Sequence, residues 1–283
     1  MTTARLSISS WSLHRLLGKA WYETDADGEM TNRCDEMPKI ELLDVPGEAR
    51  RHGIGTVEFC HFHFPSTEQA YLGELNSAID AADIELFSIL IDTGDISAAH
   101  ETERTADLKM MRRWIDVAAT LGAGHVRIIA GDQAPAEDAI LRSVDGLLGL
   151  TEYAKAKGVR TLTENFKQLA ARPEVCLEIL ARCHGEVGLC ADFGNFPEQT
   201  RTRDLAAVLP QATSIHAKAE YVNGEMDREA YIENVELSVT AGFDGPLSLI
   251  YQDTEGVWDR LEEMKVVTEQ VWMSRGQEKE RRQ

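Results

Sequence analysis

The sequence predicts an α/β protein with one domain, a (β/α)8 barrel in which eight parallel strands alternate with eight helices. Short apolar runs alternate with longer amphipathic stretches along almost the whole chain, which is the pattern of repeated βα units. The chain has 283 residues, within the range that such barrels occupy as one domain. We assign residues 1–275 to the barrel and residues 276–283 to a polar C-terminal tail.

Eight strands are expected where short apolar runs lie between turn-forming or polar residues. In chain order, these strands are predicted at residues 6–10, 55–60, 84–90, 125–130, 159–164, 188–192, 213–218 and 246–251.

Eight helices are expected in the amphipathic stretches that follow these strands. Glycine closes several of the helical patterns just before a strand, where the backbone needs a residue that tolerates positive φ, and these glycines are Gly53, Gly122, Gly158 and Gly242. The helices are predicted at residues 40–52, 67–82, 101–121, 136–157, 173–183, 202–209, 228–241 and 255–273.

The segment from residue 14 to residue 38 interrupts this rhythm because it is long, polar and poor in periodic apolar residues. We interpret it as a loop on the catalytic face, since it follows the first strand of the barrel. A lid over the site and a variable surface insertion are both compatible with this position.

Charge and cysteine content restrict the partners and the compartment. The formal net charge of −19 repels phosphate backbones and anionic membranes, so we expect neither nucleic acid nor membrane as a partner. The five cysteines form an odd set without a CxxC pair, which favours a reducing compartment. Because no signal peptide and no long apolar segment are recognisable, we expect a cytoplasmic protein.

Ionisable side chains stand at the ends of three consecutive predicted strands. In a (β/α)8 barrel the C-terminal ends of the strands carry the chemistry, so Glu164, Asp192 and His216 are expected to converge there. Two carboxylates and one imidazole suit Mn²⁺, Mg²⁺, Co²⁺ or Zn²⁺. Taken singly, each residue has a structural alternative, because a carboxylate can cap a helix and a histidine can be hydrogen bonded in the core.

Five short motifs in this order resemble the xylose-isomerase-like TIM barrels, also called the sugar phosphate isomerase/epimerase superfamily. The resemblance covers nearly the full chain, and it implies a divalent ion held by a Glu, an Asp, a His and a second Glu from strand eight. It also implies proton transfer by carboxylates beside the metal, and a homo-oligomer. The motifs are GIGTVE (53–58), LGAG (121–124) leading to Val126-Arg127, TEN (163–165), DFGN (192–195) and HAK (216–218).

The last strand departs from the pattern of the superfamily. Ile250 stands where similar proteins carry the second Glu, and an aliphatic side chain can neither bind a metal nor move a proton. Three replacements are compatible with the sequence: Gln252 or Asp253 reaches the ion, a water fills the position, or Lys218 supplies the second proton-transfer group.

Glu164 and Lys218 are therefore the candidate catalytic residues, with Glu164 as both base and metal ligand. Lys218 resembles the lysine that often follows the metal histidine in this superfamily, and its alternative role is an ion pair with Glu220 or Glu164. The candidate substrate-binding residues are His61, Arg127, Asn165 and Asn195. An ion pair with Glu58 or Glu164 is the alternative for Arg127, and turn stabilisation is the alternative for the two asparagines.

The leading hypothesis is a divalent-metal-dependent isomerase, or a related lyase, that acts on a sugar, a keto-sugar or an inositol derivative. The α-proton is removed by a carboxylate and the cation stabilises the enediolate. The first alternative is a barrel that lost catalysis and serves as a binding or accessory subunit, for which Ile250 is the evidence. The second is an abasic-site endonuclease, which the acidic charge and the missing extra ligands oppose.

Overall fold

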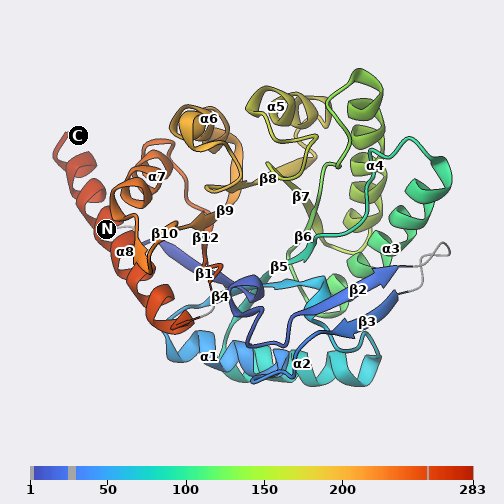
Figure 1. The fold of residues 1–283 in the computed structure, drawn as a ribbon, viewed down its shortest axis with the longest axis horizontal. Coiled ribbons are helices and arrows are strands. Elements are labelled where there is room, and N and C mark those ends of the chain that lie inside the picture. The colour runs from blue at the N-terminus through green and yellow to red at the C-terminus, as the bar shows by residue number, and fades with distance from the viewer. Residues whose placement is uncertain (1–2, 25–29, 254, 283) are drawn as a thin grey trace.

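The strands of the computed structural model form the closed barrel that the sequence predicts (Figure 1). The structure describes residues 3–24, 30–253 and 255–282. Neighbouring strands are parallel, and their order around the barrel is β1-β12-β9-β8-β7-β6-β5-β4. Their bounds are β1 (Arg5–Ser9), β4 (Thr56–Cys60), β5 (Glu85–Ile91), β6 (His125–Ile128), β7 (Arg160–Glu164), β8 (Val187–Asp192), β9 (Ala212–Lys218) and β12 (Pro246–Ile250).

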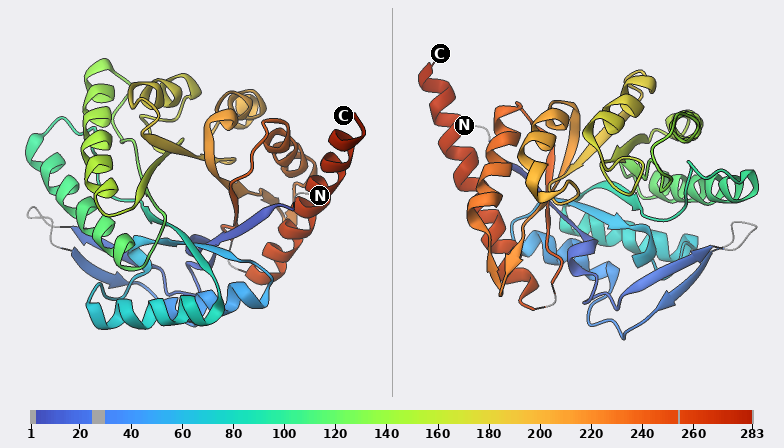
Figure 2. Two further views of the ribbon diagram at one scale, coloured as in Figure 1. Left: turned by 180° about the vertical axis from the view of Figure 1, so that it is seen from behind. Right: turned by 45° about the horizontal axis from the view of Figure 1, so that its top comes forward.

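The helices surround the strands as an outer ring (Figures 1 and 2). All four glycines that were predicted to close helices have positive φ, between +68° and +78°. The last helix extends past its expected end at residue 273 and runs through the predicted tail to Arg282. The bounds are α1 (Val45–Arg51), α2 (Gln69–Ala82), α3 (Glu101–Thr120), α4 (Glu137–Lys155), α5 (Pro173–Arg182), α6 (Arg201–Val208), α7 (Arg228–Thr240) and α8 (Val257–Arg282), with short 3-10 helices η1 (Ser10–Leu13), η2 (Leu42–Asp44), η3 (His61–His63), η4 (Glu198–Thr200) and η5 (Leu209–Gln211).

Apolar side chains of the helices pack against the outer faces of the strands and form one large core, in which Trp114 of α3 and Leu147 of α4 are fully buried. The barrel interior is more polar. Glu58 of β4 contacts His216 of β9, and because these strands are not neighbours in the sheet, the contact crosses the interior. Polar residues therefore lie beneath the face on which the strands end.

The segment at 14–38, predicted as a loop, contains an antiparallel hairpin of β2 (Ala20–Thr24) and β3 (Met30–Cys34), while residues 25–29 lie outside the described chain. The hairpin lies outside the barrel (Figure 2). The two strands form their backbone hydrogen bonds with each other, so neither strand needs a long run of apolar residues. Tyr22 anchors it to the barrel by donating a hydrogen bond to the carbonyl of Phe64 at 2.5 Å. A second small hairpin joins β10 (Tyr221–Val222) to β11 (Glu225–Met226).

No helix in the described ranges has the length and apolar character needed to cross a membrane. All five cysteines are free, four of them buried, as expected for a chain without a disulfide framework.

Candidate active site

A cavity of about 360 Å³ opens where the barrel strands end. One part of its wall is aromatic and aliphatic, and the rest carries ionisable groups from β6, β7, β8 and β9. Trp11 and Trp21 belong to the aromatic part, where Trp21 of the hairpin packs against Phe62 with ring centroids 5.1 Å apart. The lining residues are Ser9, Trp11, Trp21, Cys60, Phe62, Leu90, Asp92, Arg127, Glu164, Phe166, Lys167, Asp192, Asn195, His216, Lys218, Ile250 and Gln252.

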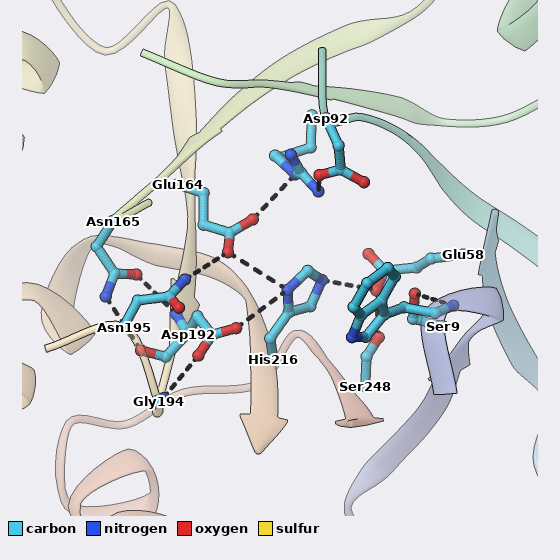
Figure 3. Close-up of polar contacts among 12 residues, drawn as sticks. Ser9, Glu58, Asp92, Glu164, Asn165, Asp192, Gly194, Asn195, His216 and Ser248 are labelled. Atoms are coloured by element: carbon cyan, nitrogen blue, oxygen red, sulfur yellow. Dashed lines mark hydrogen bonds and ion pairs between the residues drawn. The ribbon is translucent and has the colours of Figure 1, made fainter. Parts of the chain in front are cut away.

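Glu164, Asp192 and His216 meet at the floor of this cavity (Figure 3). Glu164 and Asp192 are the last residues of β7 and β8, and His216 lies in register with Asp192 on β9. Nδ1 of His216 lies 3.7 Å from Oε1 of Glu164 and 3.7 Å from Oδ2 of Asp192. All three side chains are buried, so their polar atoms face one another rather than bulk water.

The other ring nitrogen of His216 is held from inside the barrel (Figure 3). Nε2 of His216 lies 3.1 Å from Oε2 of the fully buried Glu58, and Ser248 donates a hydrogen bond to the same oxygen at 2.5 Å. A carboxylate can only accept, so the proton of a neutral His216 resides on Nε2. Nδ1 then presents its lone pair to the gap between Glu164 and Asp192.

This arrangement fits a divalent metal ion. Carboxylate oxygens and an imidazole nitrogen are suitable donors, and a carboxylate behind the histidine is the usual means of fixing the tautomer of a metal ligand. Burial alone would lower the pKa of His216, but Cys190, Glu164 and Glu58 hold it well above the usual value. Burial alone would raise the pKa of Asp192, but His216 and Lys218 hold it below its usual range.

Arg127 of β6 bridges two carboxylates at the edge of the cavity. Its Nε lies 2.9 Å from Oε2 of Glu164, and its terminal nitrogen lies 2.5 Å from Oδ1 of Asp92. Burial alone would raise the pKa of Asp92, but the Arg127 guanidinium holds it below its usual range. The predicted alternative for Arg127, a buried ion pair with Glu164, is present in the structure, and its contact with substrate stays a prediction.

The two predicted asparagines contact different residues of this cluster. Asn195 lines the cavity and donates to Oε1 of Glu164 at 2.9 Å. Asn165 is fully buried and exchanges two hydrogen bonds with the backbone of Asp192, at 2.7 and 3.0 Å. Asn165 thus fixes the end of β8, whereas Asn195 touches a side chain of the site itself.

Lys218 lines the cavity, and within the described residues its ammonium has no hydrogen bond or ion pair. Its two expected alternative partners are engaged elsewhere, Glu220 with Arg201 at 2.6 Å and Glu164 with Arg127. A Cβ at Gly194 would lie 2.4 Å from Cδ of Lys218, so the absence of a side chain there lets the lysine lie across the loop after β8.

The wall formed by β12 carries Ile250, which is buried and lines the cavity. Gln252 also lines it, whereas Asp253 lines a neighbouring cavity. His61 is fully buried, and its Nε2 lies 2.9 Å from the hydroxyl oxygen of Thr93. His61 does not line the cavity. The predicted role of His61 in substrate binding stays a prediction.

Several neighbours were not among the predicted site residues. Asp92 directly follows the third barrel strand, and the rule that placed the other carboxylates at strand ends applies to it equally. The link from Glu58 to His216 joins residues 158 positions apart and has no local sequence signal. Cys190 lies beside Glu164 in the sheet register, and Glu164, Cys190 and His216 each offer a ligand atom within 4.8 Å of the others.

The fold and the site define a (β/α)8 barrel with a carboxylate and histidine cluster at its catalytic face. The profile of the Xylose isomerase-like TIM barrel family matches residues 46–260, and the chain belongs to this family. No curated protein sequence matches the chain.

Solved structures share the fold at low sequence identity. One is D-psicose 3-epimerase with D-tagatose from Clostridium cellulolyticum H10 (12% identity, TM-score 0.69, 95% of this chain and 99% of that one). Another is the probable 3-DHS dehydratase AsbF involved in petrobactin synthesis from Bacillus anthracis (16%, 0.67, 93% and 98%). A third is a xylose isomerase-like TIM barrel protein from Mycobacterium smegmatis in complex with magnesium (16%, 0.63, 81% and 89%).

Proposed function

We propose that the protein is a divalent-metal-dependent isomerase, or a related lyase, that removes an α-proton from a sugar, a keto-sugar or an inositol derivative. The observation that carries this proposal is the placement of Nδ1 of His216 at 3.7 Å from both Glu164 and Asp192. The names of the structural neighbours, a sugar epimerase and a dehydratase among them, are consistent with this class of reaction.

Each part of the site has a distinct role in the proposed reaction. Glu164 is the base, because it stands at the cavity floor with Asn195 and Arg127 fixing its two oxygens. A divalent cation, when bound by Glu164, Asp192 and His216, supplies positive charge that stabilises the enediolate. Lys218 lines the cavity and has no hydrogen bond or ion pair to a described residue, so its ammonium can donate to substrate oxygens. The aromatic wall around Trp11 and Trp21 packs against the C–H face of a polyol and excludes water.

Ile250 limits the stereochemical outcome. Epimerisation through an enediolate usually needs a proton-transfer group on each face of the carbon, and the β12 wall offers only an aliphatic side chain. Proton transfer on one face, as in aldose–ketose isomerisation, or elimination of a neighbouring hydroxyl needs a single base. We therefore favour these two reactions over epimerisation by two carboxylates.

Deuterium exchange tests the proposal. Chelator-treated protein is reloaded with Mn²⁺, Mg²⁺, Co²⁺ or Zn²⁺ and incubated in D₂O with ketoses, inososes and keto-glycosides. We expect metal-dependent exchange at one carbon, and a fall of about 100-fold or more in Glu164→Gln, as for loss of a general base. Glu174→Gln, at an exposed position on α5, is the matched control and keeps the wild-type rate. Failure of the purified protein to bind any divalent metal at any tested pH would exclude this function.

An accessory subunit without catalysis is the second candidate, and Ile250 is the observation that favours it. This second hypothesis gains support if the protein binds the metal and Glu164→Gln leaves every measured activity unchanged. An endonuclease with a metal cluster has less support, because the part of the chain that the structure describes holds one group of three or more clustered ligand side chains, Glu164, Cys190 and His216.

A further inference from the structure

Cys190 lies beside two residues of the proposed metal centre, Glu164 and His216. It precedes Asp192 by two residues on β8, and residues two apart on a strand face the same side, so both side chains face the barrel interior. Cys190 is the register neighbour of Glu164 on β7 and is fully buried. Its sulfur, one oxygen of Glu164 and one ring nitrogen of His216 lie within 4.8 Å of one another.

We propose that the Cys190 thiolate is a ligand of the metal ion, and that it makes the centre select Zn²⁺ or Co²⁺ over Mg²⁺. This inference rests on the proposed metal centre and adds the identity of one ligand and the class of cation. The centre lacks the strand-eight carboxylate because Ile250 occupies that wall. A sulfur from β8 adds a donor to the proposed centre beside Glu164 and His216, the two residues with which Cys190 is clustered.

The donor chemistry determines which cation such a centre prefers. Mg²⁺ takes oxygen ligands in octahedral geometry, and thiolate is a poor ligand for it. Zn²⁺ accepts sulfur, nitrogen and oxygen in a tetrahedron, and Co²⁺ is a divalent ion that imidazole and thiolate also bind. A set of one thiolate, one imidazole and two carboxylates therefore matches Zn²⁺ or Co²⁺ and penalises Mg²⁺.

Coordination by Cys190 would give a spectroscopic signal. A coordinating thiol is deprotonated, so a cation bound at Cys190 would have a thiolate ligand, with the thiol proton released to solvent. A thiolate-to-metal charge-transfer band therefore reports coordination by this residue.

Cys60 provides a matched comparison. It is also buried and lines the same cavity, yet it belongs to no group of three or more clustered ligand side chains among the described residues. Its sulfur lies 3.9 Å from the hydroxyl of Ser9 on β1. Replacing Cys60 tests whether any cysteine at the cavity affects the metal, and replacing Cys190 tests the proposed ligand.

The first experiment uses chelator-treated protein titrated with Co²⁺ and followed by absorption. We expect a near-ultraviolet thiolate-to-cobalt charge-transfer band in the wild type and in Cys60→Ser, and no such band in Cys190→Ser. We also expect the Zn²⁺ affinity of Cys190→Ser to be more than about tenfold lower than that of the wild type. Removing a residue that only supports a metal ligand already weakens metal binding by about tenfold, and loss of a ligand should cost more. Mg²⁺ affinity should change less than Zn²⁺ affinity. An unchanged Zn²⁺ affinity in a folded Cys190→Ser protein would overturn the proposal.

X-ray absorption on the zinc-loaded wild type decides the matter without any variant. A sulfur scatterer at about 2.3 Å beside nitrogen and oxygen at about 2.0–2.1 Å supports the proposal. Nitrogen and oxygen scatterers alone would overturn it, while leaving the metal-dependent function in place. Absence of any bound divalent metal would remove both, so the two failures are distinguishable.

Discussion

Glu58 connects the barrel interior to the candidate active site. It is fully buried on β4 and reaches across the barrel to Nε2 of His216 at 3.1 Å. Ser248 of β12 donates to the same carboxylate oxygen, so the acceptor is itself held in place. One residue without access to substrate thus determines which nitrogen of His216 faces the cavity.

We expect Glu58→Gln to weaken divalent metal binding by about 10- to 100-fold, as removal of the carboxylate behind a metal-bound histidine usually does. Gln keeps the shape of the side chain but lacks the charge that fixes the His216 tautomer. The dissociation constant for Zn²⁺ or Mn²⁺, measured by competition with a chromophoric chelator, is the readout, and thermal unfolding verifies that the variant is folded. Ser248→Ala is the control with a smaller expected loss. An equal affinity in Glu58→Gln and wild type would contradict this role.

Glycine has different effects at the end of a helix and in the interior of one. Gly242 follows α7 with φ of +77°, and a Cβ there would meet nothing within 4 Å. Gly149 lies inside α4 on an exposed face, and a Cβ there also meets nothing within 4 Å. Space is available at both positions, so only the backbone conformation distinguishes them.

Alanine at these two positions should therefore change stability in opposite directions. Gly242→Ala is expected to lower the free energy of unfolding by about 1 kcal/mol, because an L-residue is strained at positive φ. Gly149→Ala is expected to raise it by about 0.5–1 kcal/mol, because alanine restricts the unfolded chain and favours the helix. Urea unfolding of both variants measures the difference. A shift of the same sign in both would show that the φ at residue 242 is not the deciding factor.

The elements of the barrel were predictable because each follows from local pattern. The predicted strands at 125–130 and 213–218 overlap β6 and β9, with ends that differ by one or two residues. The hairpin of β2 and β3 was missed, because its strands pair with each other outside the barrel and show no sustained alternation. Its contribution of Trp21 to the cavity wall depends on tertiary packing that local pattern does not encode.

At the scale of the whole molecule, some residues of the site were predictable from the sequence and others were not. Glu164, Asp192 and His216 were predictable because the barrel places strand ends on one face. The roles of Glu58 and Cys190 depend on which strands become neighbours, or face each other across the barrel, and on how deep each side chain lies. The assembled structure was therefore required to identify the residues behind and beneath the three that meet at the cavity floor.

Buried histidines set how the stability of the whole molecule depends on pH. Burial lowers the pKa of His14, His61 and His125 from 6.5 to about 4, and it also lowers the pKa of His63 well below its usual value. Because these pKa values are lower in the folded protein, the histidines of the unfolded chain take up protons at a higher pH than those of the folded protein do. Stability is therefore lost as the pH falls from about 6.5 toward 4.

We expect the free energy of unfolding, measured in the presence of a chelator, to decrease as the pH falls from about 6.5 to 4, and to decrease less steeply in His125→Gln. His216 does not produce this slope, because its raised pKa confines its effect to pH values above 6.5. His125 contacts the carbonyl of Phe87 at the base of the barrel and does not line the cavity, so its replacement isolates stability from substrate binding. His100→Gln, at an exposed position, should keep the wild-type slope. Equal slopes for His125→Gln and wild type would mean that His125 does not contribute to the acid sensitivity of the fold.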